Sequence, residues 1–128
     1  MRRTSVTTDK APSAIGPYSQ AIKTDSMVFV SGQLPIDPAS GELVTGDIRQ
    51  ETRQALLNLQ AILKASGSAL EQVVKTTVYI ADMDQFGEIN AVYAEFFTAD
   101  PPARACVEVA RLPKDANVEV EAIALLNP

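Results

Sequence analysis

Pro102-Ala-Arg-Ala-Cys-Val-Glu-Val-Ala-Arg-Leu-Pro113 is the stretch that says most about how this chain folds. Between the two prolines, Arg104, Cys106 and Glu108 alternate with small or apolar residues. Successive side chains of a strand point to opposite faces of a sheet, so these three share one face while alanine and valine fill the other. The pattern predicts a strand over residues 104–110 that places a guanidinium beside the only thiol of the chain.

The other elements follow from periodicity and end signals on either side of that strand. Apolar residues at helical spacing predict one helix between Asp47 and Gly67 and a second between Asp82 and Asp100. Each helix begins with an aspartate that has a glutamine three residues later, the pattern of a capping box. Further strands are expected at residues 4–8, 18–24, 27–31, 73–80 and 118–126. The order predicts an α+β fold in a single domain of residues 1–128.

The predicted sheet has more apolar surface than its helices can cover. Two helices cover one face of a sheet of this size, yet residues 28–30, 74–80 and 118–126 are apolar on both faces or nearly so. On a monomer, the uncovered face would be a large exposed apolar patch. We therefore expect a homo-oligomer that packs sheet against sheet, and the alternative is a monomer with an exposed apolar sheet.

The composition argues against several classes of protein. No run approaches the roughly 18 apolar residues that a membrane span needs, and the basic N-terminus lacks the apolar run of a signal peptide. A net charge of −5 without a cluster of Lys and Arg argues against nucleic-acid binding. A single cysteine cannot form an internal disulfide, which is typical of the cytoplasm.

The chain contains no histidine, and this restricts the chemistry sharply. It excludes a Ser–His–Asp triad and removes the side chain that most often transfers protons near neutral pH. The sequence also lacks metal-ligand spacings, a dinucleotide-binding glycine motif and a phosphate loop, so neither a metal nor a cofactor is expected. Catalysis would have to use Arg, Glu, Tyr, Ser, Cys and backbone groups.

Three side chains on the last two strands are candidates for that chemistry, and each has a structural alternative. Arg104 forms either an ion pair with Glu108, Glu119 or Glu121, or a bidentate clamp for an anionic group. Alternation alone predicts that Glu119 and Glu121 point outward into solvent, but Ile123 and Leu125 share their face. On this partly apolar face Glu119 is either paired or acts as the base that activates a water. Cys106 is either a small buried side chain or a nucleophile. Without a histidine its activation would rest on Arg104 alone, which favours the first alternative and a role for its backbone.

Four more residues are candidates for the lining of a binding site. Tyr18 follows a Gly-Pro turn and either packs with a solvated hydroxyl or presents that hydroxyl to a pocket. Ser31 and Gly32 end a strand at the start of a long loop, where glycine permits close approach of a ligand or serves the loop alone. Asn90 lies beside the apolar stripe of the second helix and is either a satisfied polar group or a substrate contact.

Across nearly its whole length the chain resembles the RidA family, also called YjgF, the reactive-intermediate imine deaminases. The resemblance rests on several short motifs that occur in the order typical of that family. They are Ala14-Ile-Gly-Pro-Tyr-Ser-Gln-Ala21, Val30-Ser-Gly-Gln33, Val74-Lys-Thr-Thr-Val-Tyr79, Ile89-Asn-Ala-Val-Tyr93, Phe96-Phe97, Pro102-Ala-Arg-Ala-Cys-Val-Glu-Val-Ala-Arg-Leu-Pro-Lys-Asp115 and Val118-Glu-Val-Glu-Ala122.

The resemblance implies a chorismate-mutase-like fold and a homotrimer whose three sheets form a central barrel, with helices outside and active sites between subunits. It implies hydrolysis of 2-aminoacrylate, 2-iminopropanoate or 2-iminobutanoate to 2-oxo acids and ammonia, without a metal or an organic cofactor.

The family pattern also assigns roles to residues of this sequence. It implies that Arg104 holds the substrate carboxylate, Glu119 activates water and Cys106 faces the substrate with its backbone. The tyrosine lining the cleft falls on Tyr18, and the Ser-Gly pair falls on Ser31 and Gly32. Arg104 would lower the pKa of Glu119 while burial would raise it, and the sequence leaves that balance open.

Two other functions remain as alternatives, an endoribonuclease or translation inhibitor and a non-catalytic trimer that binds small ligands. The segment at residues 98–102 is shorter than in some members of the family, which leaves the preferred imine open.

Overall fold

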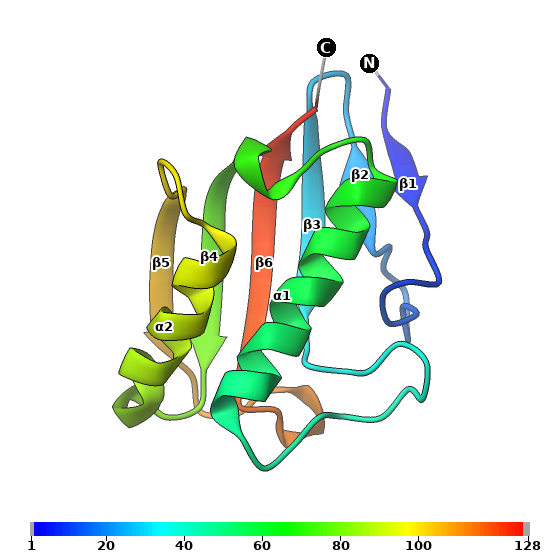
Figure 1. The fold of residues 1–128 in the computed structure, drawn as a ribbon. Coiled ribbons are helices and arrows are strands. Elements are labelled where there is room, and N and C mark those ends of the chain that lie inside the picture. The colour runs from blue at the N-terminus through cyan, green and yellow to red at the C-terminus, as the bar shows by residue number, and fades with distance from the viewer. Residues whose placement is uncertain (1, 127–128) are drawn as a thin grey trace.

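Six strands form a single sheet and both helices lie on one of its faces (Figure 1) in the computed structural model, which describes residues 2–126. The strands are β1 (Thr4–Val6), β2 (Ala21–Lys23), β3 (Met27–Gln33), β4 (Val73–Ile80), β5 (Ala103–Glu108) and β6 (Val118–Leu125). Their order across the sheet is β1-β2-β3-β6-β4-β5, so the last strand of the chain lies near the centre and β5 forms one edge. The predicted α+β fold with two helices on one face is confirmed.

The sheet is mixed because of one connection. Strands β4 and β5 run parallel, and α2 (Phe86–Phe96) crosses between them, as a parallel connection requires. All other neighbouring strands are antiparallel. The parallel pairing sets Thr76 opposite Arg104 and Val78 opposite Cys106, which fixes the face to which each side chain of β5 points.

Helix α1 (Ile48–Ala65) forms where its end signals and apolar stripe predicted. The Asp47 carboxylate accepts a hydrogen bond from the Arg49 backbone N–H at 2.9 Å, and Gly67 follows the helix with a φ of +84° that favours glycine. The expected inner face is buried throughout, at Ile48, Thr52, Ala55, Leu56, Leu59, Ile62 and Leu63. No helix among residues 2–126 is apolar over enough length to cross a membrane.

Helix α2 begins and ends inside its predicted limits. Asp82 caps a 3-10 turn at Met83–Gln85 instead of the α-helix, because its carboxylate accepts from the Asp84 N–H, and Gln85 makes no capping hydrogen bond. The helix ends at Phe96, before the predicted limit at Asp100. The capping-box prediction was therefore wrong for this helix, although its apolar residues Ile89 and Tyr93 are buried in the core.

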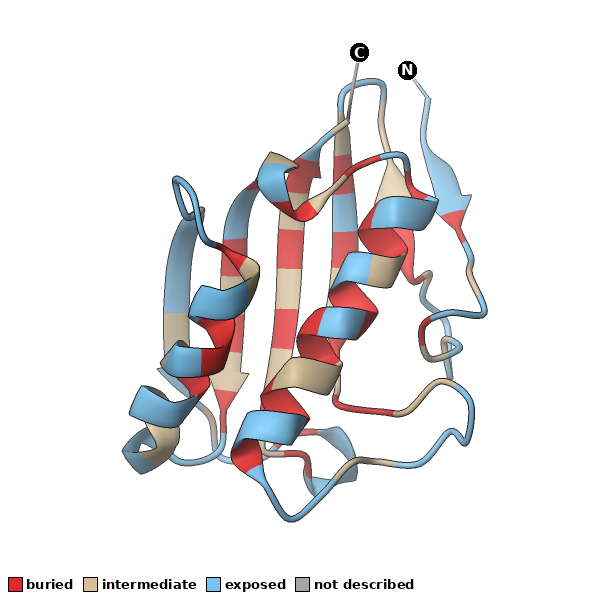
Figure 2. Cartoon of the chain, viewed as in Figure 1, coloured by how far each residue is buried: buried red, intermediate tan, exposed pale blue. Residues whose placement is uncertain are grey.

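The two faces of the sheet differ in how deeply their side chains are buried, because the helices cover only one of them (Figure 2). Toward the helices, β6 buries Val118, Val120, Ala122 and Ala124. On the helix-free face, Phe29, Val107 and Leu125 are each 42% exposed, from three different strands. An exposed apolar face without helices, as the sequence predicted, is therefore present on the single chain.

Candidate active site

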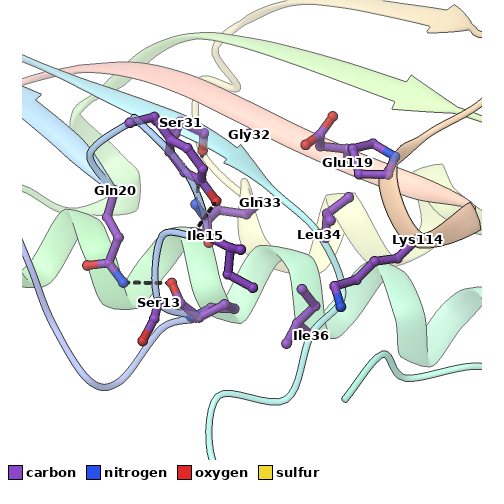
Figure 3. Close-up of a pocket in the computed structure, with 13 residues that line it drawn as sticks. Ser13, Ile15, Gln20, Ser31, Gly32, Gln33, Leu34, Ile36, Lys114 and Glu119 are labelled. Atoms are coloured by element: carbon purple, nitrogen blue, oxygen red, sulfur yellow. Dashed lines mark hydrogen bonds between the residues drawn. The ribbon is translucent and has the colours of Figure 1, made fainter. Parts of the chain in front are cut away.

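A pocket of about 540 Å³ opens at the end of β3 (Figure 3). Four of the predicted site residues line it: Tyr18, Ser31, Gly32 and Glu119. They come from the N-terminal turn, from β3 and from the start of β6. The antiparallel pairing of β3 with β6 therefore brings together segments that are distant in sequence.

The closest contact in this pocket joins Glu119 to Gly32. A methyl group built on Gly32 would lie 2.6 Å from Glu119 Oε2 and 2.8 Å from its carboxyl carbon, closer than real Cβ contacts. The Glu119 carboxylate therefore occupies the space beside Gly32 where a side chain would stand, and a role for Gly32 in ligand binding stays a prediction. Glycine at position 32 lets the acid lie flat against the backbone of β3.

Burial raises the pKa of Glu119, and the neighbouring carboxylate of Glu121 raises it further. Both effects disfavour the charged form, the first through lost hydration and the second through like-charge repulsion. Arg104 contributes no opposing effect within one chain. The question that the sequence left open is thus answered for the single chain, where this pKa is raised.

The remaining polar groups of the pocket are tied to its backbone. The Ser31 hydroxyl donates to the Ser19 carbonyl at 2.6 Å, which pins the end of β3 to the segment before β2. The Tyr18 hydroxyl accepts a long hydrogen bond of 3.4 Å from the Ile15 N–H, and the ring is half exposed at the pocket mouth. Tyr18 therefore lines the pocket, and a role for its hydroxyl there stays a prediction.

Two buried amides hold the pocket walls, and the sequence analysis missed both. Gln20 is 3% exposed and bonds Thr8 with both ends of its amide, accepting from the N–H at 2.7 Å and donating to the carbonyl at 3.0 Å. Asn58 is 1% exposed and donates to the carbonyls of Leu34 and Ile36 at 3.0 and 2.9 Å. No local pattern distinguishes Gln20 from a solvated amide. Helical spacing does place Asn58 with Ala55 and Ile62 on the buried face of α1, but the two carbonyls to which it donates lie far away in the sequence.

Lys114 also lines this pocket and was missed (Figure 3). Its φ is +59° and that of Asp115 is +56°, a left-handed conformation that is uncommon outside glycine. An ion pair of 2.8 Å between Arg111 and Asp115 spans this loop.

Arg104 lies in a separate hollow that it shares with Asn90, Tyr93 and two prolines. Its Nη1 donates to Asn90 Oδ1 at 2.7 Å, and its guanidinium carbon lies 4.8 Å from the centre of the Tyr93 ring. The ion pairs between side chains of residues 2–126 are Arg53–Glu95 and Arg111–Asp115. The expected pairing of Arg104 with a glutamate of its own chain is therefore wrong.

Cys106 lies two residues along β5 on the same face. It is partly buried against the core, and burial raises the pKa of its thiol while Arg104 lowers it to a smaller extent. A thiol with a raised pKa is mostly protonated at neutral pH and is a poor nucleophile. Of the two alternatives for Cys106, the structure favours the small packed side chain.

The candidate residues thus fall into two groups on opposite faces of the sheet. In β4, Thr76 pairs with Arg104 and Tyr79 pairs with Glu119. Positions three apart on a strand point to opposite faces, so Arg104 points toward the helices and Glu119 points away from them. We call Arg104, Cys106 and Asn90 the arginine group, and Tyr18, Ser31, Gly32 and Glu119 the glutamate group.

Comparison with known proteins identifies the family of the chain. The sequence profile of the family described as Endoribonuclease L-PSP matches residues 8–126. A mouse protein named 2-iminobutanoate/2-iminopropanoate deaminase is 51% identical over 123 residues, which cover 96% of this chain and 91% of the mouse protein.

Solved structures agree with that assignment. A Yersinia pestis protein of the Rid family has a TM-score of 0.95 at 44% identity, covering 98% of this chain and 100% of that one. The Escherichia coli protein TdcF, crystallised with serine bound, has a TM-score of 0.93 at 45% identity, covering 97% of this chain and 99% of that one. The chain belongs to the RidA family, whose sequence profile carries the name Endoribonuclease L-PSP.

Proposed function

We propose that the protein is a hydrolytic deaminase that converts 2-iminopropanoate, 2-iminobutanoate and the enamine 2-aminoacrylate to 2-oxo acids and ammonia. The observation that carries this proposal is the state of Arg104, whose guanidinium contacts an amide and aromatic rings but no carboxylate among residues 2–126. An arginine held in this way is available for the carboxylate of a 2-imino acid. The name of the mouse relative supports this substrate class.

The active site proposed here combines the two groups from neighbouring copies of the chain. Arg104 of one copy would hold the substrate carboxylate, with Asn90 beside it and the Cys106 backbone facing the substrate. Tyr18, Ser31, Gly32 and Glu119 of the next copy would close the site. This arrangement accounts for two groups that one chain keeps on opposite faces. A homotrimer with a central barrel of sheets would also bury the exposed apolar face.

In this site, Glu119 takes a proton from water while the water oxygen bonds to the imine carbon. The electrons of the C=N double bond move onto the imine nitrogen, which takes a proton from solvent, so that a tetrahedral intermediate with one hydroxyl and one amino group results. Glu119 returns its proton to the amino group, and the C–N bond breaks as ammonia leaves. The hydroxyl group loses its proton to solvent as the carbonyl of the 2-oxo acid forms. Fixing the carboxylate and one water within reach supplies most of the acceleration that such a labile bond needs. The scheme uses only side chains and backbone of this chain, and it suits a cytoplasmic enzyme.

The test is a coupled assay in which an amino-acid oxidase generates the imine and the released ammonia is timed. Glu119→Gln should abolish enzyme-dependent ammonia release while pyruvate still binds. Arg104→Ala should lose activity while the oligomer stays intact. Unchanged turnover in Glu119→Gln would remove the glutamate from the mechanism, and an inert binding protein would show no turnover in any form.

Endoribonuclease activity is the second candidate, because the family profile carries that name. A net charge of −5 works against it. RNA binding that weakens steeply with rising salt, together with cleavage that Glu119→Gln does not affect, would favour this candidate.

A further inference from the structure

In the part of the chain that the structure describes, the groups that hold the Arg104 guanidinium are all neutral. Its carbon lies 4.8 Å from the centre of the Tyr93 ring and 5.5 Å from that of Phe86, and Nη1 donates to Asn90 Oδ1 at 2.7 Å. All three partners belong to α2. Contacts of this kind fix the plane of the group and leave its charge unneutralised, which an ion pair with a carboxylate would not do.

Tyr93 is itself fixed from the neighbouring strand. Its hydroxyl forms a buried hydrogen bond of 2.7 Å with the Thr76 hydroxyl, and Thr76 stands directly opposite Arg104 in the parallel pairing of β4 and β5. The ring also packs on Phe97, with centres 4.6 Å apart. Thr76 and Tyr93 are 0% and 7% exposed. The ring therefore has little freedom to turn away from the guanidinium.

The charge state of Tyr93 suits this arrangement. Burial raises the pKa of its hydroxyl above the ordinary value, so the ring remains a neutral phenol at physiological pH. A neutral ring face attracts a guanidinium through its quadrupole while leaving the cation free to bind an anion at its edge.

We propose that Tyr93, locked by Thr76, is a positioning residue that holds the Arg104 guanidinium in the orientation that receives the substrate carboxylate. This inference rests on the proposed function, in which Arg104 binds that carboxylate. An arginine that is already ordered loses less conformational freedom when the ligand binds, so removing the lock should weaken substrate binding. The carboxylate contact is the same before and during the reaction, so KM should change and kcat should not.

The decisive variants change Tyr93 and Thr76 separately and together. Tyr93→Leu removes the ring face and should raise KM about tenfold, with a matching rise in the Kd of pyruvate and kcat within about twofold of wild type. Tyr93→Phe and Thr76→Val each remove the buried hydrogen bond but keep the ring, and each should raise KM about threefold. Since both break the same bond, the double variant should be no worse than either single one.

A matched control separates positioning from general loss of packing. Phe96→Leu shortens a partly buried aromatic on the same helix that makes no ring contact with Arg104, and it should leave KM unchanged. A rise of KM in this control equal to that of Tyr93→Leu would overturn the inference. Unchanged KM in folded Tyr93→Leu would also overturn it.

If Tyr93→Leu does not fold, Tyr93→Phe and Thr76→Val decide the question, and unchanged KM in both variants rejects the role. The variant Arg104→Ala distinguishes a failure of the positioning role from a failure of the proposed function. If pyruvate binding weakens in Arg104→Ala while KM stays unchanged in the Tyr93 and Thr76 variants, only the positioning role falls. If Arg104→Ala leaves the Kd of pyruvate unchanged, the carboxylate clamp of the proposed function fails, and the positioning role fails with it.

Discussion

The position of Glu119, a proposed catalytic residue, depends on Gly32, which has no side chain. The carboxylate fills the space where a Cβ of residue 32 would stand, 2.6 Å from Oε2. The packing of Gly32 and the pKa of Glu119 are therefore linked, because contact with β3 is part of the burial that raises the pKa of Glu119.

Gly32→Ala should displace that carboxylate. We expect ammonia release to fall at least about tenfold, because a base moved by a fraction of an ångström no longer aligns with the water. The free energy of unfolding should change by less than about 1 kcal/mol, because the displaced atoms are the end of a flexible side chain. Urea denaturation and the coupled assay measure the two effects. As control, Gly87→Ala in α2 meets no atom within 4 Å and should preserve activity. Full activity in Gly32→Ala would mean that Glu119 need not lie against β3.

The pH dependence of activity tests the influence of Glu121 on Glu119. Glu119 must be ionised to accept a proton, so kcat/KM should fall as the pH drops through its pKa. Glu121 raises this pKa, so Glu121→Gln should lower it and move the acidic limb of the profile to lower pH. Glu71→Gln makes the same change in net charge at an exposed position and should not move the limb. A shift to higher pH in Glu121→Gln would contradict the assigned cause.

At the scale of elements, the pocket depends on how loops are attached to the core. Helix α1 presents Asn58 on its buried face, where apolar residues surround it. Its amide donates to the carbonyls of Leu34 and Ile36 and accepts from Gln54 Nε2 at 2.9 Å. One side chain thus satisfies two carbonyls of the loop after β3 and fixes the pocket wall they form.

Asn58→Ala should lower the free energy of unfolding by about 2 to 4 kcal/mol, since two buried carbonyls lose their donor. Gln60→Ala, on the exposed face of the same helix, should change it by less than about 0.5 kcal/mol. Chemical denaturation of both variants gives the comparison. Equal stability of the two would mean that water replaces the amide without cost.

Elements that depend on local patterns were predictable, and contacts that depend on pairing were not. The strand at 73–80 and the buried stripe of α1 follow from alternation and helical spacing alone. Asp82 was misassigned because an aspartate caps a 3-10 turn and an α-helix in the same way. The faces of Arg104 and Glu119 depend on which residues of β4 they pair with, and no local pattern specifies that register. Their roles in a shared site remain predictions.

At the scale of the whole molecule, one chain presents two incomplete halves of a site. The glutamate group opens on a pocket at the end of β3, and the arginine group lies between α2 and edge strand β5, on the side of the helices. The helix-free face, to which Glu119 points, exposes large apolar side chains from β3, β5 and β6. Contact through this face with further copies would bring one half of the site to the complementary half of a neighbour.

Subunit mixing tests this arrangement directly. Arg104→Ala and Glu119→Gln should each be inactive alone, yet oligomers refolded from an equal mixture should recover about a quarter of wild-type activity. In a ring, a site is intact only when one copy keeps Arg104 and the next copy keeps Glu119. Each condition holds for about half of the copies, so about a quarter of the sites are intact. Wild type mixed equally with the double variant should also give about a quarter, whereas a site within one chain would give about half. An inactive mixture of the single variants, with half activity in the second mixture, would assign both groups to the same chain and reject the shared site.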